Sequence, residues 1–291
     1  MKVLILGGNG YLGSKLAHAL VQKLGSDAVI CTQRTGSRTG RLDDLKSQIH
    51  IIPTSVDAIS AVLQYEKIDA VCNMICNYSR SNLLYDSVLD ANIEFPLNVL
   101  NLITERQISR FITIGTSLPP HLNMYSFSKA MLGEFGKYYA EKHGIAFTDI
   151  RLEMFYGSDE PRDRFLPGLI VKMLRGEPVD VTLGTQRRDI LSAEDAVRAL
   201  EMILSAELPG YQCVQVGTGT APSISEIVDF IWEQTGKRSV VRKGAVPMRE
   251  NEPDCVADPA LLRSLGTWTP TDWRTGLSGM IDNIRKEQEQ I

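Results

Sequence analysis

The chain has 291 residues, of which 43% are apolar and 23% are charged, and it carries a formal net charge of −4. A chain of this length and apolar content can bury a sizeable core, and it is near the size at which one core divides into two lobes. The weak negative charge offers no general attraction to nucleic acid or to an anionic membrane, so we expect neither as a partner. No apolar run approaches the roughly 18 residues of a membrane span. The short apolar run at the N-terminus is unlike a signal peptide, so we expect a cytoplasmic protein.

The cysteines and histidines show no pattern that would hold a metal ion. The five cysteines are odd in number and lie mostly in apolar, strand-like runs, which indicates reduced, buried thiols. The four histidines are scattered without ligand spacing. We therefore expect no metal site. The residues concerned are Cys31, Cys72, Cys76, Cys213 and Cys255, and His18, His50, His121 and His143.

The first predicted element is a short apolar strand, VLIL, that runs directly into three glycines. Gly7, Gly10 and Gly13 are spaced as G-x-x-G-x-x-G, a variant of the G-x-G-x-x-G fingerprint. Glycines at these positions let the backbone turn tightly beside a pyrophosphate, and the helix that follows directs its N-terminus at the anion. The segment predicts a dinucleotide site, with Tyr11 and Leu12 as further cofactor contacts.

Five more apolar runs follow, each separated from the next by a helical pattern. This alternation is typical of parallel strands joined by crossover helices. We therefore predict an α/β fold with a Rossmann-type, doubly wound parallel sheet. The runs are Ala28 to Thr32, Ile49 to Ile52, Ala70 to Ile75, Phe111 to Ile114 and Ala146 to Leu152.

Candidate catalytic residues follow the fifth predicted strand. Helical periodicity over Asn123 to Glu134 places Tyr125 and Lys129 on one face, about one turn apart. An ammonium beside a phenol lowers the pKa of the phenol toward the range where proton transfer is efficient. Thr116 and Ser117 come directly after the strand, at the edge where open parallel sheets bind ligands, so a hydroxyl there can bond a reacting oxygen. Turn formation is the alternative for both hydroxyls, and it is the better interpretation of Ser117.

The order of elements loosens from about residue 158. A helix at Leu166 to Arg175 and a strand at Val179 to Leu183 precede a helix from Ser192 and a strand at Cys213 to Val216. This pattern predicts a second, smaller lobe of mixed α/β structure. We expect the dinucleotide-binding domain over 1–157, with 186–216 returning to it, and a substrate-binding lobe over 158–185 and 217–291.

Taken in order, the glycine loop, Thr116 and the Tyr125-x-x-x-Lys129 pair resemble the extended short-chain dehydrogenase/reductase family, in the branch that acts on nucleotide-sugars. The resemblance covers nearly the whole chain, and Asn92 in LDANIEF and Arg151 in RLEMFYG are further matching pieces. It implies that Tyr125 is the acid/base and that Thr116 orients the substrate oxygen. It also implies that Lys129 holds the nicotinamide ribose and lowers the pKa of the tyrosine.

The same resemblance implies a set of substrate contacts. Arg188 and Arg249 are expected to contact the diphosphate or nucleotide, since guanidinium geometry suits phosphate oxygens. Ser117 belongs to the same expected set. The alternative for each arginine is a surface ion pair, Arg188 with Asp189 and Arg249 with Glu250.

The end of the second predicted strand carries no carboxylate. In relatives that prefer NAD, an acidic residue at this place forms hydrogen bonds with the ribose hydroxyls. This chain reads CTQR there. Arg34 suits a 2′-phosphate, Thr32 adds a hydroxyl, and Arg38 or Arg41 adds charge, whereas a solvated basic loop is the alternative. We therefore expect NADP, as NADPH, with NAD as the second choice.

Other departures from the family pattern reduce the number of reactions that we expect of this enzyme. Dehydratases carry an Asp and a Glu after the threonine, and this chain reads TSL there, so elimination is not expected. Epimerases of the family keep NAD bound, so a site for NADP favours a reductase. The segment TSLPPHLNMYSFSK resembles the nucleotide-sugar 4-ketoreductases that complete deoxysugars, including the CDP-abequose synthase type. Met154 stands where many relatives have Asn, and Glu153 beside it is either a substrate contact or a strand-end residue.

We therefore predict an enzyme that reduces a nucleotide-linked 4-keto-deoxysugar with NADPH. An NAD-dependent nucleotide-sugar epimerase and a non-catalytic, NADP-binding regulator are the alternatives, and the paired arginines speak against an uncharged ketone of the steroid or flavonoid type. Family members commonly pair two helices from each subunit. The helices after Leu89 and after Tyr125 are apolar enough to do so, and we expect a homodimer.

Overall fold

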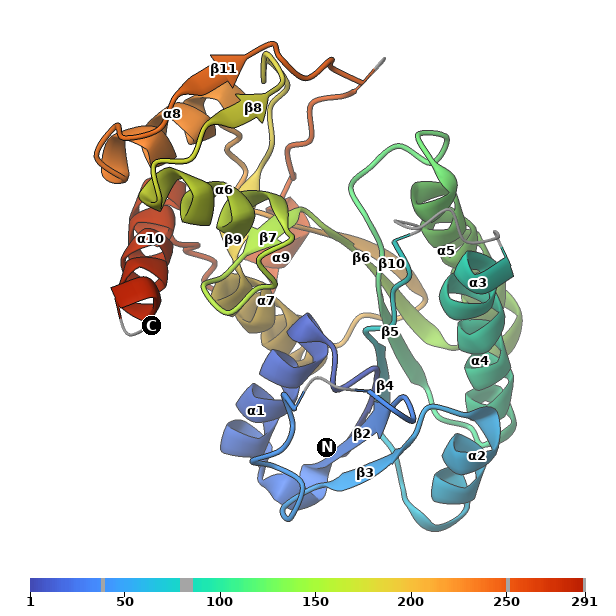
Figure 1. Ribbon diagram of the computed structural model, residues 1–291. Helices are drawn as coiled ribbons and strands as arrows, with labels where there is room; N and C mark the ends of the chain where they lie inside the picture. The colour runs from blue at the N-terminus through green and yellow to red at the C-terminus, as the bar shows by residue number, and fades with distance from the viewer. Residues whose placement is uncertain (38–39, 79–85, 250–251, 290–291) are drawn as a thin grey trace. The chain divides into compact units, whose positions relative to one another are not determined.

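Figure 1 shows the chain as a computed structural model, which describes residues 1–37, 40–78, 86–249 and 252–289. The chain divides into two compact units, each of which is described by itself below. Unit 1 comprises Met1–Leu152, Val197–Val214 and Ser264–Gly266, and unit 2 comprises Glu153–Ala196, Gln215–Arg263 and Thr267–Ile291. The binding roles that the sequence assigns to the two parts stay predictions.

A seven-stranded sheet forms the centre of unit 1, in the order β10-β6-β5-β4-β1-β2-β3. Every pairing from β3 across to β6 is parallel. The prediction of a doubly wound parallel sheet is confirmed, and the strand order reverses between β1 and β4, which is where such sheets bind ligands. The strands are β1 (Val3–Leu6), β2 (Val29–Gln33), β3 (His50–Pro53), β4 (Ala70–Asn73), β5 (Arg110–Ile114), β6 (Ala146–Leu152) and β10 (Tyr211–Val216).

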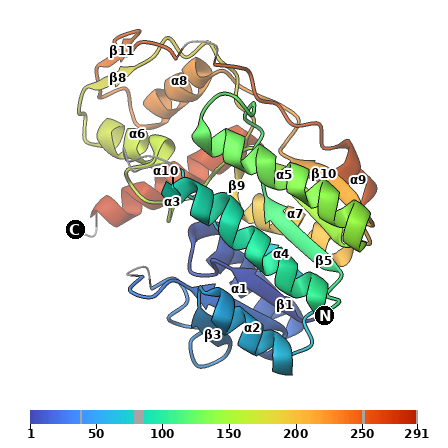
Figure 2. The same ribbon diagram turned by 90° about the vertical axis from the view of Figure 1, so that its right-hand side faces the viewer.

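Helices cover both faces of this sheet (Figures 1 and 2). On one face, α2, α4 and α5 enclose a core of fully buried side chains that includes Leu4, Val71, Phe111 and Phe147. On the other face lies α1, and Lys23 on α1 forms an ion pair of 3.7 Å with Glu201 on α7. The helices are α1 (Tyr11–Leu24), α2 (Val56–Tyr65), α4 (Phe95–Glu105), α5 (Met124–His143) and α7 (Ala193–Ser205), with short turns at η1 (Ser26–Ala28), α3 (Asp86–Leu89) and η2 (Asp90–Glu94).

Unit 2 is smaller and mixes short strands with helices. The strand β7 (Met154–Tyr156) pairs with β9 (Ile190–Ser192), and β8 (Val179–Val181) pairs with β11 (Val241–Lys243). Its core is a separate cluster of buried residues around Tyr156. The helices are α6 (Phe165–Leu174), α8 (Ile224–Gln234), α9 (Ala260–Ser264) and α10 (Trp273–Glu289).

Two predicted elements end at different residues in the structure. The helix that carries Tyr125 runs to His143, where Gly144 takes a left-handed conformation with φ of 68°. The strand predicted to reach Leu183 ends at Val181, and Leu183 is 57% exposed before the left-handed Gly184. Glycines with positive φ end both elements, since other residues rarely adopt that conformation.

Within the described ranges, the five cysteines are free thiols, and no group of His, Cys, Asp or Glu side chains is arranged to hold a metal ion. A search of the same residues finds no helix with the length and hydropathy of a bilayer span.

Candidate active site

The loop after β1 turns so tightly that its glycines leave no room for side chains. A Cβ on Gly13 would lie 2.4 Å from the carbonyl oxygen of Gly7, and a Cβ on Gly8 would lie 2.6 Å from Cβ of Cys31. Gly7 has φ of 73°, and its carbonyl accepts a hydrogen bond of 2.9 Å from the Gly10 amide. The backbone therefore forms a narrow cradle that leads straight into α1.

The helix that follows begins without a side-chain cap. Its N-cap is Gly10, so no hydroxyl or carboxylate from that residue covers the amides of the first turn. Tyr11 lies partly exposed at this end, with Arg41 5.7 Å and Lys15 5.3 Å from its ring centroid. Leu12 is 8% exposed and belongs to the core, so any contact of Leu12 with a cofactor would come through its backbone.

Thr32 lies below the glycine loop rather than on its surface. Its hydroxyl accepts a hydrogen bond of 2.9 Å from the Gly7 amide and another of 3.1 Å from the Thr54 hydroxyl, and the side chain is fully buried. The Thr32 hydroxyl therefore holds the loop against β2, and a contact of this residue with the cofactor stays a prediction.

Arg34 occupies the predicted place at the end of β2. It follows Gln33 directly and is exposed, and no carboxylate stands at the end of that strand. Arg38 lies outside the described residues. Arg34 is two residues from Thr32, whose carbonyl accepts a hydrogen bond of 2.9 Å from the Gly8 amide of the loop.

Thr116 and Tyr125 come together at the carboxyl end of β5. A capping box between Asn123 and Ser126 fixes the start of α5, which places Tyr125 in the first turn. The side chains of Tyr125 and Thr116 are joined by a hydrogen bond. The Thr116 oxygen also accepts a bond of 3.3 Å from the Leu118 amide, so this hydroxyl orders the turn as well.

Lys129 reaches the place where the strand order reverses. Its side chain is 3% exposed, and Nζ donates a hydrogen bond of 3.0 Å to the carbonyl of Ile75, just after β4. Ile75 borders the glycine loop, since a Cβ on Gly7 would lie 3.0 Å from its Cγ1. The ammonium, the phenol and the glycine cradle therefore share one edge of the sheet in unit 1.

The pKa of Tyr125 differs from the sequence-based expectation. Burial raises it well above its ordinary value of 10.0, Cys76 and Tyr78 raise it further, and the Thr116 hydrogen bond opposes them. The ammonium of Lys129 donates a hydrogen bond to the Ile75 carbonyl. Burial also lowers the pKa of Lys129, and interactions with Cys76 and Asp149 oppose that shift. The phenol therefore carries its proton at neutral pH.

Residues after β4 complete the site, and no motif in the sequence marks them. The ring of Tyr78 is tilted by 37° against that of Tyr125 with the centroids 5.1 Å apart, and Cys76 is hydrogen-bonded to the same phenol. Asn92 holds this segment, accepting from the Asn77 amide at 2.8 Å and donating to its carbonyl at 3.0 Å. Their position at the end of the strand next to β1 was the available signal.

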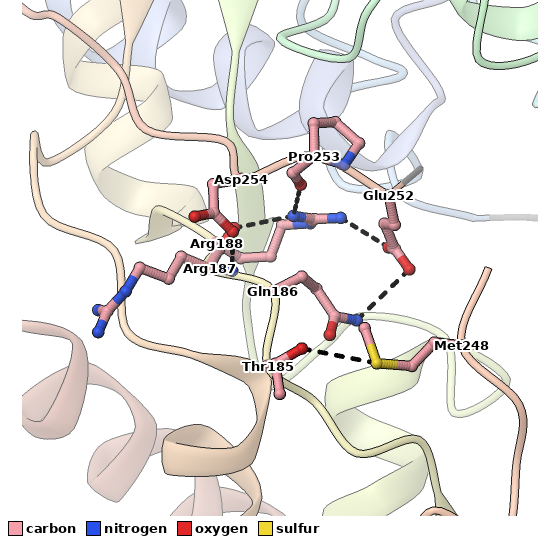
Figure 3. A network of polar contacts seen from close by, with 8 residues as sticks. All are labelled: Thr185, Gln186, Arg187, Arg188, Met248, Glu252, Pro253 and Asp254. Carbon is pink, nitrogen blue, oxygen red and sulfur yellow. Dashed lines mark hydrogen bonds and ion pairs between the residues drawn. The ribbon is translucent and has the colours of Figure 1, made fainter. Parts of the chain in front are cut away.

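The predicted substrate arginines belong to unit 2. Arg188 is only 8% exposed, and its guanidinium donates to the carboxylate of Glu252 at 2.6 Å and to the carbonyls of Arg187 and Pro253 (Figure 3). Gln186 extends the network to the other oxygen of Glu252 at 3.4 Å. Arg188 thus has an ion-pair partner 64 residues away.

The proposed pairing of Arg188 with Asp189 is wrong. Asp189 is fully buried and accepts hydrogen bonds from the amides of Thr218 and Gly219 and from the Thr218 hydroxyl, so it fixes the turn after β10. Arg249 is exposed, and its suggested partner Glu250 lies outside the described residues. Ser117 is half-buried beside Thr116 in unit 1.

These features agree with a match to a protein-family model. The model of the NAD dependent epimerase/dehydratase family covers residues 3–217, about three quarters of the chain. The chain belongs to this family. The resemblance to extended short-chain dehydrogenases/reductases is therefore confirmed, and membership makes the protein an NAD(P)-dependent enzyme.

Several family members are similar over nearly their whole length. CDP-abequose synthase from Salmonella typhimurium is 27% identical, over 97% of this chain and 98% of its own. UDP-glucose 4-epimerase from Lactobacillus helveticus is 26% identical, over 93% of this chain and 92% of its own. A crystal structure of UDP-glucuronic acid 4-epimerase from Bacillus cereus, in complex with UDP-glucuronic acid and NAD, matches with a TM-score of 0.85 at 23% identity, over 99% of this chain and 100% of that one.

The cofactor of this epimerase/dehydratase family fits the glycine cradle. The positions where a Cβ would collide are those at which the backbone must approach a pyrophosphate, and the uncapped start of α1 offers amide donors to an anion. Lys129 and Tyr125 stand at the same edge of the sheet.

Proposed function

We propose that this enzyme reduces the keto group of a nucleotide-linked 4-keto-deoxysugar, with NADPH as reductant. The observation that carries the proposal is the placement of Thr116, Tyr125 and Lys129 together at the carboxyl edge of the sheet, beside the glycine cradle. The Tyr125 phenol can supply the proton that reduction of a carbonyl needs. Similarity to CDP-abequose synthases supports the deoxysugar class.

In this mechanism Tyr125 and Thr116 act on the carbonyl oxygen of the substrate. Their hydroxyls hold that oxygen, and Tyr125 transfers its proton to it as the carbonyl carbon is reduced. NADPH, when bound, supplies the hydride. Both hydrogen bonds strengthen as negative charge develops on the oxygen, which is the difference in stabilisation that accelerates the step. Lys129 would hold the nicotinamide ribose.

The cofactor preference is expected to depend on Arg34. Its exposed guanidinium beside the cradle suits a 2′-phosphate, because charge-assisted bonds to phosphate oxygens are strong. Arg34→Asp should reduce the ratio of kcat/KM for NADPH to that for NADH by about 100-fold. Arg106→Asp makes the same charge change on an exposed residue after α4, at the opposite edge of the sheet, and should leave the ratio unchanged. An unchanged ratio in Arg34→Asp would remove this assignment.

The nucleotide of the substrate is assigned to unit 2. Arg188 and Arg249 can supply guanidinium groups to a diphosphate. Arg188 is held by Glu252, so an anion that binds Arg188 has to displace or share that carboxylate. The CDP of the similar synthases makes a CDP-linked sugar the first substrate to test.

The function is tested by mixing purified protein with NADPH and a CDP-linked 4-keto-6-deoxysugar, and following NADPH oxidation and the product. A thermal-shift series with NAD, NADH, NADP and NADPH, each with and without CDP, UDP, GDP and dTDP, requires no turnover. It measures binding at the cofactor site and at the substrate-nucleotide site. Loss of NADPH with formation of one 4-hydroxy sugar supports the proposal. Tightly held NAD with interconversion of epimers would show that the enzyme is an epimerase and not a reductase. Cofactor binding without turnover of any keto-sugar would favour a regulator.

We also propose that the enzyme is a homodimer that pairs α4 and α5 with the same helices of a second copy, in the cytoplasm. A groove of about 730 Å³ runs between these helices, and aromatic side chains line it. Phe135 is 40% exposed and Tyr138 is 55% exposed, although both are large and apolar. The groove includes Leu97, Asn101, Met131, Phe135, Tyr138 and Tyr139.

The dimer is tested by light scattering after size exclusion. Wild-type protein should show twice the mass of 32.3 kDa, and Phe135→Glu with Tyr138→Glu should show the single mass, because two carboxylates then face the apolar groove. Tyr65→Glu alters a tyrosine that is 87% exposed at the end of α2 and should stay dimeric. A wild-type protein of 32.3 kDa at micromolar concentration would contradict the proposal.

A further inference from the structure

The turn that follows β2 carries the arginine on which the proposed choice of cofactor depends. Residues 34–37 form a β-turn, in which the Ser37 amide donates a hydrogen bond of 3.0 Å to the Arg34 carbonyl. Gly36 has φ of 76°, a left-handed conformation that is typical of the third position of a type II turn. The first and last Cα atoms of a β-turn lie within about 7 Å of each other. A contact that fixes Ser37 therefore also fixes the backbone from which the Arg34 side chain starts.

One side chain joins this turn to the glycine loop. Nδ2 of Asn9 donates a hydrogen bond of 2.9 Å to Oγ of Ser37, which lies 28 residues away in the sequence. Asn9 is only 6% exposed although it is polar, so its amide group has lost most of its contact with water. Buried polar groups are hydrogen-bonded within the protein, and the loss of such a bond is not made good by solvent. The bond between Asn9 and Ser37 is therefore a fixed part of the loop.

The backbone beside Asn9 is itself held against the sheet. The Gly8 amide donates a hydrogen bond of 2.9 Å to the carbonyl of Thr32 in β2. A Cβ on Gly8 would lie 2.6 Å from Cβ of Cys31, so the loop and the strand are in close contact at this point. Asn9 thus projects from a rigid support, and the turn is the part that its side chain holds in place.

A fixed turn favours the binding of a phosphate by the arginine at its start. Arg34, Thr35 and Gly36 are exposed, so water reaches the outer side of the turn. An arginine loses side-chain freedom when it binds a phosphate, and a turn without support would lose backbone freedom as well. Because the Asn9 bond removes that backbone freedom before the ligand arrives, it lowers the cost of binding. The bond therefore acts on a ligand through Arg34.

We propose that Asn9 is a positioning residue for cofactor selection, which holds the turn at 34–37 so that Arg34 meets the 2′-phosphate of NADPH. The inference rests on the proposed function only for the cofactor, since the 2′-phosphate is assigned to Arg34 there. NADH has a hydroxyl in place of this phosphate, so its affinity does not depend on the position of the turn. Asn9 thus discriminates between the two dinucleotides by way of Arg34.

The test measures the dissociation constants of NADPH and NADH by fluorescence titration, with no sugar substrate present. In Asn9→Ala the constant for NADPH should rise about tenfold, as expected for one buried hydrogen bond, and the constant for NADH should stay within about twofold. Ser37→Ala removes the acceptor and should give the same selective loss, whereas Ser37→Thr keeps the hydroxyl and should keep the wild-type ratio. Asn283→Ala alters an exposed asparagine on α10 and should change neither constant.

A double variant tests whether Asn9 acts through Arg34. In Arg34→Ala protein, the further change Asn9→Ala should leave both dissociation constants unchanged, because the guanidinium that the turn positions is gone. Residues that act through one group give non-additive effects in such a double-mutant cycle. A further tenfold loss of NADPH affinity in the double variant would overturn the inference, since Asn9 would then act independently of the arginine.

The wild-type titration separates this inference from the proposed function. If the wild type binds NADPH no more tightly than NADH, the proposed cofactor is wrong and the inference falls with it. If the wild type prefers NADPH but folded Asn9→Ala keeps the wild-type ratio of the two constants, only the inference is overturned. Should Asn9→Ala not be recovered folded, Ser37→Ala, at the half-buried partner, carries the same expectations. None of these results depends on whether a keto-sugar is reduced.

Discussion

Tyr125→Phe should abolish reduction of the keto-sugar while leaving NADPH binding intact. The variant keeps the ring that contacts Tyr78 and loses only the hydroxyl that is bonded to Thr116. Positioned proton transfer contributes a factor of 10² to 10⁴, so kcat should fall by about 10³-fold. Steady-state kinetics measures the loss, and fluorescence titration should give an NADPH dissociation constant within about twofold of the wild type.

The matched control for this variant lies on the same helix. Tyr138→Phe removes a hydroxyl from a side chain that is 55% exposed on α5 and should keep full turnover. Near-normal reduction by Tyr125→Phe would show that another group donates the proton. In that event Cys76 is the first candidate, because its side chain is hydrogen-bonded to the same phenol.

Gly13→Ala should destroy the cofactor site although it adds one methyl group. The new Cβ would lie 2.4 Å from the Gly7 carbonyl oxygen, a contact that a flexible side chain cannot relieve because both partners are held by the backbone. Either α1 or the loop has to move, which opens the cradle. We expect the NADPH dissociation constant to rise by about 100-fold or more, equivalent to roughly 2.7 kcal/mol. Isothermal titration calorimetry on the folded variant measures the change.

Gly279→Ala is the corresponding control. This glycine is exposed on α10, and a Cβ there meets no atom within 4 Å. Alanine is the better helix former by about 1 kcal/mol, so the thermal midpoint should rise slightly and NADPH affinity should not change. Tight NADPH binding by Gly13→Ala would mean that the cradle is more tolerant than its packing indicates.

The fold could be predicted from the sequence because its signals are local. The apolar run of β1, the glycines after it and the helical repeat of α1 stand within the first 24 residues. Alternation of strands and helices restricts the connections to parallel crossovers, and this leads to the observed sheet. The residues at which α5 and β8 end were not predicted correctly. A single glycine does not mark the end of an element, because glycine is also common inside loops.

Parts of the site were not predictable because they depend on which side chains face which layer. The strand β2 is buried on both faces from Val29 to Thr32, so no alternation of apolar and polar residues shows where the Thr32 hydroxyl points. Partners far apart in the chain are equally hidden. Glu252 lies 64 residues from Arg188, and Tyr211 lies 62 residues from Asp149. Strand register and loop packing bring such pairs together, and no spacing in the sequence encodes them.

The division of roles between Thr32 and Arg34 bears on how this enzyme could change during evolution. The buried Thr32 hydroxyl ties the Gly7 amide to Thr54, so a substitution there disturbs every cofactor alike. Arg34, two residues on, is exposed, and exposed substitutions change stability little. On the role proposed for Arg34, single codon changes at this exposed position would exchange one nicotinamide dinucleotide for the other, while the bonds of Thr32 inside the loop stay constant.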